Sequence, residues 1–183
     1  LGLVSGYFKG RVDSIIMRIV DVFLAFPDYL LALAIIAVLG RGLLNAMLAV
    51  GLAFIPKFAR IVRASALSES GLDYVAGARA LGGKHIRLIF RHVLPNCLAP
   101  ILVVATLSLG TAILFTSALS FLGLGAKPPY PEWGAMLAEG REASFQAPHL
   151  MIFPGLAIAL AVLGVNLLGD GLRDALDVRL QDD

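Results

Sequence analysis

The sequence predicts an all-α, polytopic membrane protein. Its 183 residues are 58% hydrophobic and only 15% charged, with a mean hydropathy of +0.85. Soluble domains are about 45–50% apolar and about 25% charged. Apolar runs that cross lipid must be helical, because an isolated strand would leave its backbone groups unpaired. The length fits one membrane domain without a separate globular one. Since the first residue is Leu1 and not Met, we expect the chain to be N-terminally incomplete.

Several segments contain the roughly 20 mostly apolar residues that a helix needs to cross a bilayer. The predicted spans are at about 19–39, 43–61, 97–124 and 150–169. Pro27 and Asp28 interrupt the first span, and residues 1–8 look like the tail of an earlier one. The segments 62–96 and 125–149 are then the loops between spans.

The distribution of Lys and Arg predicts the orientation, because cytoplasmic loops carry an excess of both. The stretch from Lys57 to His92 is strongly basic and has only Glu69 and Asp73 as acidic residues. Its basic residues are Lys57, Arg60, Arg63, Arg79, Lys84, Arg87 and Arg91. The other loop has Lys127 and Arg141 against Glu132, Glu139 and Glu142. The sequence therefore places the loop 62–96 and the C-terminal tail in the cytoplasm, and the loop 125–149 outside.

The stretch 73–96 is a polar, basic insert, in which we expect two short helices. The first should run from about 72 to 81, with Ser70 as its cap. Gly82 and Gly83 should end it, because glycine reaches the left-handed conformation without steric cost. The second should begin at Lys84 and end near Val93, because Pro95 disfavours a helix at the residue before it. We expect it to be amphipathic and to lie near the bilayer surface. Its predicted apolar face consists of Ile86, Ile89, Phe90 and Val93.

The centre of the first helix is the small-residue sequence AGARA, residues 76–80. Small side chains let the backbone of a partner approach closely, so this helix suits a groove in another protein. Gly77 inside a helix costs about 1 kcal/mol relative to Ala. We therefore expect packing or contact to account for it.

The spacing of the insert resembles the EAA loop of permease subunits of binding-protein-dependent ABC importers. That pattern is Glu-Ala-Ala, three residues, Gly, nine residues, Ile, one residue and Leu-Pro. On this chain it falls on Ala76, Gly77, Ala78, Gly82, His92, Leu94 and Pro95. Ala76 replaces the Glu, Gly77 replaces an Ala and His92 replaces the Ile. The first of these departures removes a possible polar contact to the ATPase.

Three further segments look like the dipeptide, oligopeptide and nickel branch of that family: VDVFLAFPDYLLALAIIAVLG, ALSFLGLGAKPPYPEWGAMLAEGR and NLLGDGLRDALDVRL. The resemblance implies a type I ABC importer transmembrane domain, of the C-type subunit, in a bacterial or archaeal plasma membrane. It would form half of a translocation pathway with a second, homologous permease. Di- or oligopeptides are the expected substrates, with nickel or another small solute as the alternative.

The resemblance also implies the partners and the coupling residues. Two cytoplasmic ATPase subunits would bind ATP and Mg and dock on the coupling loops, and an extracytoplasmic solute-binding protein would deliver the substrate. The chain itself would hold no cofactor and catalyse no covalent chemistry. The implied ATPase-coupling residues are Tyr74, Val75, Ala76, Gly77, Ala78, Arg79, Ala80, Leu81, Gly82, Leu94 and Pro95.

Other classes of protein fit the sequence less well. An ATP-independent secondary transporter usually shows inverted repeats, and no convincing internal repeat is found. The run from Gly77 to Lys84 is not a phosphate loop, because Gly83 intervenes before Lys84 and His85 follows it. Positive-inside bias explains the basic residues without a nucleic-acid partner.

Asp28 and Asn166 are the candidates for residues that line the pathway, because polar groups inside spans are often functional. Local satisfaction of the backbone near Pro27 and hydrogen bonding between helices are the competing interpretations. The three histidines are too scattered for a metal site, and Cys97 is the only cysteine.

The external loop contains Tyr130 and Trp133, followed by a predicted short helix from about Glu132 to Gly140. Aromatic residues at this depth usually anchor a protein at the membrane interface. A surface presented to the binding protein is the alternative.

Overall fold

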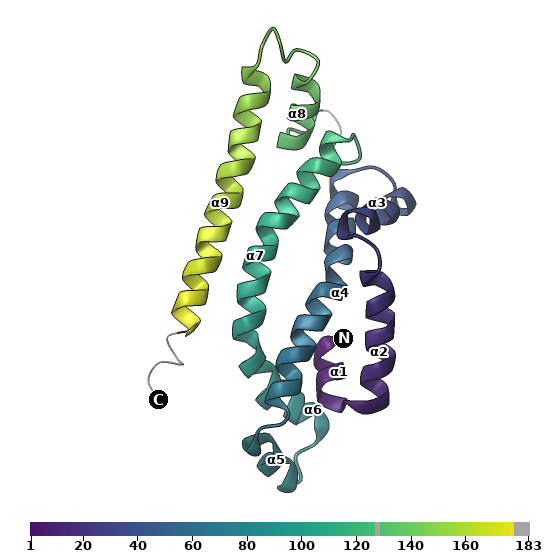
Figure 1. Cartoon of the computed structure of the whole chain (residues 1–183), viewed down its shortest axis with the longest axis vertical. Coiled ribbons are helices and arrows are strands. Elements are labelled where there is room, and N and C mark those ends of the chain that lie inside the picture. The colour runs from purple at the N-terminus through teal and green to yellow at the C-terminus, as the bar shows by residue number, and fades with distance from the viewer. Residues whose placement is uncertain (127–128, 178–183) are drawn as a thin grey trace. The chain divides into compact units, whose positions relative to one another are not determined.

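The computed structural model describes residues 1–126 and 129–177, and within them it contains helices and no strands. Lys127, which counts toward the predicted orientation, and the C-terminal tail from residue 178 lie outside this range. The predicted all-α fold is confirmed. The helices, most of them labelled in Figure 1, are α1 Gly2–Phe8, α2 Gly10–Leu24, α3 Asp28–Leu39, α4 Leu43–Glu69, α5 Asp73–Ala80, α6 His85–Leu88, the π-helical turn η1 Ile89–Val93, α7 Leu94–Phe121, α8 Trp133–Gly140 and α9 His149–Asp177.

Three stretches of helix in this part of the chain are long and apolar enough to cross a membrane. They are α4, the continuous helix from His85 to Phe121, and α9, and the pair α2 and α3 satisfies the same criteria when taken together. The predicted single span 19–39 is therefore divided in two. Pro27 cannot donate to the helical ladder and disfavours helix at Phe26, so the chain leaves the helix there and α3 begins at Asp28.

The chain forms two compact units. Among the described residues, unit 1 contains Leu1–Phe26 and Ile55–Val104, with the last residues of α9 from Leu176, and unit 2 contains Pro27–Phe54 and Ala105–Ala175. The basic insert 73–96 belongs to unit 1. The predicted external loop 125–149 belongs to unit 2.

In unit 1, α1 packs directly on the backbone of α4. A Cβ atom placed on Gly6 would lie 2.6 Å from the carbonyl oxygen of Arg63, and one on Gly2 would overlap the carbonyl oxygen of Ala59. The two glycines are four residues apart, which is the spacing that lets membrane helices approach closely. No larger side chain fits either position without moving one of the helices.

Ion pairs join α2 to α4 in the same unit. Arg63 donates from Nε and Nη2 to the two carboxylate oxygens of Asp13, each at 2.5 Å, and Ser5 also donates to Asp13. Arg60 pairs with Asp21 at 2.6 Å on the exposed side. Two arginines of the basic stretch therefore have acidic partners from a distant part of the sequence.

The structure confirms that Gly82 and Gly83 end α5, the first helix of the insert. Gly82 has a φ of 81°, and the N–H groups of Gly82 and Gly83 donate to the carbonyl oxygens of Arg79 and Ala78 at 3.0 and 3.1 Å. This is the Schellman arrangement that ends many helices. The predicted cap at its start is wrong. Ser70 donates to the carbonyl oxygens of Leu67 and Gly6, and Leu72 precedes the helix without a side-chain cap.

The predicted end of the second helix near Val93 is also wrong, because α6 continues through η1 into α7. A π-helical turn is wider than an α-helical one, and here it comes immediately before Pro95. The helix continues through Pro95, which is the second residue of α7. The expected apolar face is divided: Ile89 and Val93 are buried, whereas Ile86 and Phe90 are exposed.

Unit 2 is held together by aromatic and backbone contacts. The ring of Phe115 on α7 lies 5.5 Å from that of Tyr29 on α3 and 5.7 Å from that of Phe54 on α4. Asn45 donates to the carbonyl oxygens of Leu39 and Gly40, which satisfies the end of α3. These contacts join α3, α4 and α7 within the unit.

The predicted helix in the loop 125–149 is confirmed as α8, which lies alongside the N-terminal part of α9 (Figure 1). Glu132 caps it, because its Oε2 accepts the N–H of Ala135 at 2.9 Å. A Cβ atom on Gly134 would overlap the carbonyl oxygen of Ser117 on α7. The absence of a side chain at Gly134 is therefore what lets α8 begin directly on α7.

Candidate functional site

The basic insert folds around a small apolar core in unit 1. Val75 of α5, Leu88 of α6 and Val93 of η1 have no exposed surface. They pack in one buried cluster that also contains Tyr7, Ala66, Ile89 and Cys97. Burying apolar side chains is the main favourable term in folding. The insert is consequently a packed element, fixed to α1, α4 and α7, and not a free surface loop.

Hydrogen bonds of Tyr74 join α5 to α4 and α7, the helices that precede and follow the insert. Its hydroxyl donates to Oε2 of Glu69, the last residue of α4, at 2.8 Å, and accepts from Nδ2 of Asn96 on α7, also at 2.8 Å. Asn96 donates in addition to the carbonyl oxygen of His92. Burial and the Glu69 carboxylate raise the pKa of Tyr74. The phenol therefore stays protonated and keeps its donor.

Tyr7 of α1 is a second tyrosine that holds the insert in place. Its hydroxyl lies 2.9 Å from Nδ1 of His85, the first residue of α6. The guanidinium carbon of Arg79 on α5 lies over the Tyr7 ring, 5.5 Å from its centroid, within the range of a cation–π contact. One buried tyrosine thus contacts both short helices of the insert.

One face of α5 remains open, and we call it the α5 surface: Ala76, Gly77, Ala80, Leu81 and Gly82. All five are exposed, and Leu81 has 91% of its surface accessible. A Cβ atom on Gly77 would have no atom of the chain within 4 Å. This face presents one large apolar side chain among small residues, above a buried core. Such an arrangement can receive another protein at close range.

The structure divides the predicted coupling residues by position. Val75 is buried, and Ala78 is partly buried against the same core, so both support α5 from within. Leu94 and Pro95 begin α7, beside Asn96, which bonds to Tyr74. Arg79 is exposed but reaches the Tyr7 ring. Whether any of these residues touches an ATPase stays a prediction.

No pattern in the sequence singled out Tyr7, Glu69 or Asn96 as residues that hold the insert. Tyr7 and His85 are 78 residues apart along the chain, so no local pattern connects them. The spacing of Gly2 and Gly6 is a signal that could have shown that α1 packs on another helix.

Asp28 and Asn166, the pathway candidates, lie in unit 2. Asp28 is the first residue of α3, where a negative charge is favourable to the helix dipole. Asn166 lies against α7, since a Cβ atom on Gly110 would be 2.8 Å from its Oδ1. Their role in a pathway stays a prediction. In residues 1–126 and 129–177 no group of three or more His, Cys, Asp or Glu side chains could hold a metal.

The fold is that of a polytopic α-helical membrane protein with a packed, partly open insert in one of its units. Residues 1–182 match the family described as the binding-protein-dependent transport system inner membrane component, and the chain belongs to that family. This places it among the type I transmembrane domains of ABC importers.

Curated relatives agree with this family. The chain is 51% identical over 181 residues to the glutathione transport system permease protein GsiD of Pectobacterium atrosepticum, and 51% identical to the dipeptide transport system permease protein DppC of Alkalihalophilus pseudofirmus. It is 49% identical to the di/tripeptide transport system permease protein DppC of Pseudomonas aeruginosa. These matches cover 99 to 100% of the chain and 60% of each relative, so the chain spans about three fifths of their length.

Proposed function

We propose that the protein is a permease subunit of an ATP-driven importer of di- or oligopeptides. Its family supports the importer class, and the names of its relatives, which transport dipeptides, di/tripeptides and glutathione, support the substrate class. In this proposal the subunit forms half of a translocation pathway with a second, homologous permease. An extracytoplasmic binding protein delivers the peptide.

The α5 surface is the proposed docking site for a cytoplasmic ATPase subunit. The observation that carries this proposal is the contrast between its two sides: Val75 is fully buried, and Leu81 on the open side is 91% exposed. A large exposed apolar side chain on a rigidly held helix favours a protein partner. Because Ala76 stands where the family pattern has Glu, docking here relies on shape and on Leu81 instead of an acidic contact.

Rigid attachment is what lets a docking site transmit motion. Movement of the ATPase subunits would be passed from α5 through the Tyr74 hydrogen bonds to α4 and α7, and through Tyr7 to α1. ATP and Mg would be bound by the ATPase subunits, and this chain would catalyse no covalent step. The proposal therefore requires the insert to move with its helices.

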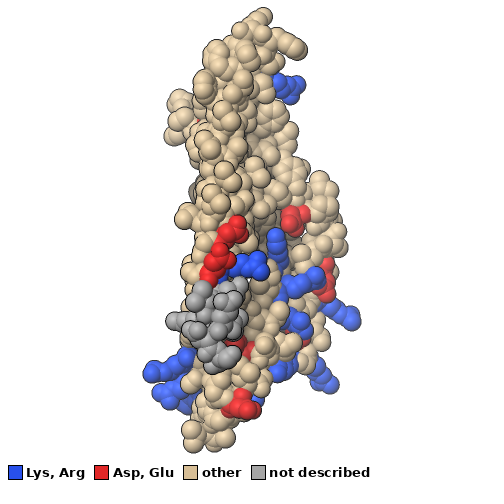
Figure 2. Space-filling view, turned by 60° about the vertical axis from the view of Figure 1, so that its left-hand side comes forward, with Lys and Arg blue, Asp and Glu red and all other residues tan. Residues whose placement is uncertain are grey.

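The proposed orientation places unit 1 toward the cytoplasm. Lys and Arg gather in this unit, at Lys9, Arg11, Arg18, Lys57, Arg60, Arg63, Arg79, Lys84, Arg87 and Arg91. On the face drawn in Figure 2, most of the blue side chains gather over one part of the surface. An excess of Lys and Arg is typical of cytoplasmic segments. The α5 surface would then face the ATPase compartment.

Substitution of Gly77 tests the docking proposal more cleanly than substitution of Gly82. Gly82 needs its positive φ, so a bulky residue there would strain the end of α5. A Cβ atom at Gly77 would meet no atom of this chain within 4 Å, and the residue is exposed, so the insert of Gly77→Leu should still fold. Gly77→Ala is the matched control, because it adds one methyl group at the same place. The full importer would be assembled with each variant and assayed for ATP-driven uptake of a labelled dipeptide.

We expect Gly77→Leu to assemble with the second permease but to lose most of its ATPase binding or ATP-driven uptake, whereas Gly77→Ala keeps both. Full uptake by Gly77→Leu would show that the α5 surface does not dock. Uptake by the unsubstituted subunit that continues without any ATPase would overturn the importer proposal itself.

A further inference from the structure

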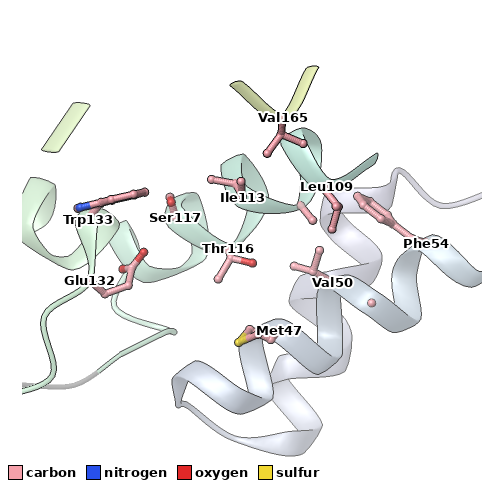
Figure 3. A pocket seen from close by; sticks show the side chains of 12 residues that line it. Met47, Val50, Phe54, Leu109, Ile113, Thr116, Ser117, Glu132, Trp133 and Val165 are labelled. Carbon is pink, nitrogen blue, oxygen red and sulfur yellow. The ribbon is translucent and has the colours of Figure 1, made fainter. Parts of the chain in front are cut away.

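Unit 2 contains a cavity of about 450 Å³ between α4, α7, α9 and the start of α8. Figure 3 shows Glu132, Trp133 and Ser117 at one side of this cavity, with Val50, Leu109 and Phe54 at the other. Sites for small molecules usually have about 300–1,000 Å³ and mostly apolar walls with a few placed polar groups. This cavity fits that description, because Glu132 is the ionisable residue among otherwise apolar, hydroxyl and indole side chains.

The start of α8 is held at the cavity by its contact with α7. Gly134 allows the first turn of α8 to lie on the backbone of Ser117, which itself lines the cavity. The neighbouring residues Glu132 and Trp133 are thereby fixed at its edge. Glu132 also lines a second, smaller groove together with Tyr130 and Glu139.

In the described parts of the chain, the ion pairs of Arg60 with Asp21 and of Arg63 with Asp13 do not involve Glu132. One carboxylate oxygen accepts the N–H of Ala135, which leaves the other for a ligand. A carboxylate beside apolar walls is stabilised by a positive counter-charge. Trp133 adds an aromatic ring, the side chain that binds cations best through its face.

We propose that this cavity binds the peptide substrate by its α-ammonium group, with Glu132 as the counter-ion and Trp133 as a second contact. The apolar side chains of the peptide would lie against Val50, Phe54 and Leu109. This inference rests on the proposed peptide substrate, and it adds a specificity determinant within the permease itself. A peptide whose amino group is acetylated lacks the charge and would bind poorly.

Protection of a cysteine in the cavity tests this proposal without the binding protein. Met47 lines the cavity and is 55% exposed, so Met47→Cys provides a reporter for labelling by N-ethylmaleimide, with Thr116→Cys as a second reporter. The native Cys97 is buried. Labelling at the reporter would be followed by mass spectrometry in the purified complex of both permeases and the ATPase subunits, with dialanine or N-acetyl-dialanine as the probe.

Glu132→Gln removes the charge but keeps an acceptor oxygen for the N–H of Ala135, so α8 should remain capped. Glu139→Gln is the matched control, because it makes the same change within α8, where Glu139 lines the groove with Tyr130 and not the cavity. We expect dialanine to slow labelling, and N-acetyl-dialanine to do so only at much higher concentration. Half-protection by dialanine should need about tenfold more peptide or greater in Glu132→Gln, and be unchanged in Glu139→Gln.

Equal protection by the two peptides would overturn the proposal and show an apolar cavity without amine recognition. Equal behaviour of the Glu132 and Glu139 variants would overturn it as well, as would labelling that dialanine does not slow at either reporter. ATP-driven uptake of dialanine by the unsubstituted importer is measured in parallel. Uptake with no protection contradicts this inference alone, whereas absence of uptake contradicts the proposed function.

Discussion

The hydroxyl of Tyr7 lies 2.9 Å from Nδ1 of His85, which joins the N-terminal helix α1 to the first residue of α6. The guanidinium group of Arg79 on α5 lies over the ring of the same tyrosine. Tyr7 lies in residues 1–8, which the sequence predicts as the tail of an earlier span, and it is a central support of the insert.

We expect Tyr7→Phe to lower the free energy of unfolding of unit 1 by about 0.5–1.5 kcal/mol, the usual net value of one hydrogen bond. The ring and its contact with Arg79 would remain. Thermal unfolding in detergent measures the change, and Tyr130→Phe, at an exposed position, is the control. Equal unfolding temperatures for the two variants would mean that the Tyr7 hydroxyl does not stabilise the insert.

The two ion pairs between α2 and α4 should differ in strength. The side chains of Asp13 and Arg63 are only 16% and 31% exposed, whereas those of Asp21 and Arg60 are more than half exposed. A double-mutant cycle with Asp13→Asn and Arg63→Gln should give a coupling energy of about 1.5–3 kcal/mol, as for hydrogen bonds to charged groups. The matching cycle at Asp21 and Arg60 should give about 0–1 kcal/mol. Similar coupling in both cycles would contradict this ranking.

Gly134→Ala should destabilise the contact of α8 with α7. The added methyl group would overlap the carbonyl oxygen of Ser117, and overpacking of this kind costs about 1–3 kcal/mol. Gly164→Ala is the control, since a Cβ atom there meets nothing within 4 Å. Unfolding temperature and proteolysis of the 125–149 segment measure the effect. A Gly134→Ala variant as stable as Gly164→Ala would refute the close approach.

The alkaline stability of the insert should depend on Tyr74. Although 42% of its surface is exposed, burial raises its pKa above the ordinary value of 10.0, and so does its hydrogen bond to the Glu69 carboxylate, while the bond from Asn96 acts in the opposite direction. A raised pKa in the folded state means that the stabilisation is complete below about pH 10 and is lost as the pH rises through the folded value.

Tyr74→Phe should therefore be less stable than the unsubstituted protein at neutral pH, and the difference should shrink above about pH 10. Unfolding temperatures of both proteins between neutral and strongly alkaline pH provide the measurement. A difference that stays constant across this range would show that the phenol does not titrate with folding.

Local chemistry made part of the site predictable. Gly82 and Gly83 gave the end of α5 correctly, because only a glycine takes the left-handed conformation at no steric cost. The continuation of the helix past Pro95 was not predictable from the proline alone. Instead of the expected break, the structure has the π-helical turn η1 directly before α7, and its residues Ile89 and Val93 are buried against the rest of unit 1.

The sequence by itself determined the class of fold, the apolar helices, the short helix α8 and the small-residue character of residues 76–82. These follow from composition, periodicity and the conformational preferences of glycine and proline, all of which act over a few residues. The tertiary structure decided which face of α5 is open, that Tyr7 and Tyr74 hold the insert, and that Glu132 borders a cavity. Each depends on residues that are distant in sequence, and only packing of the helices brings their side chains within reach.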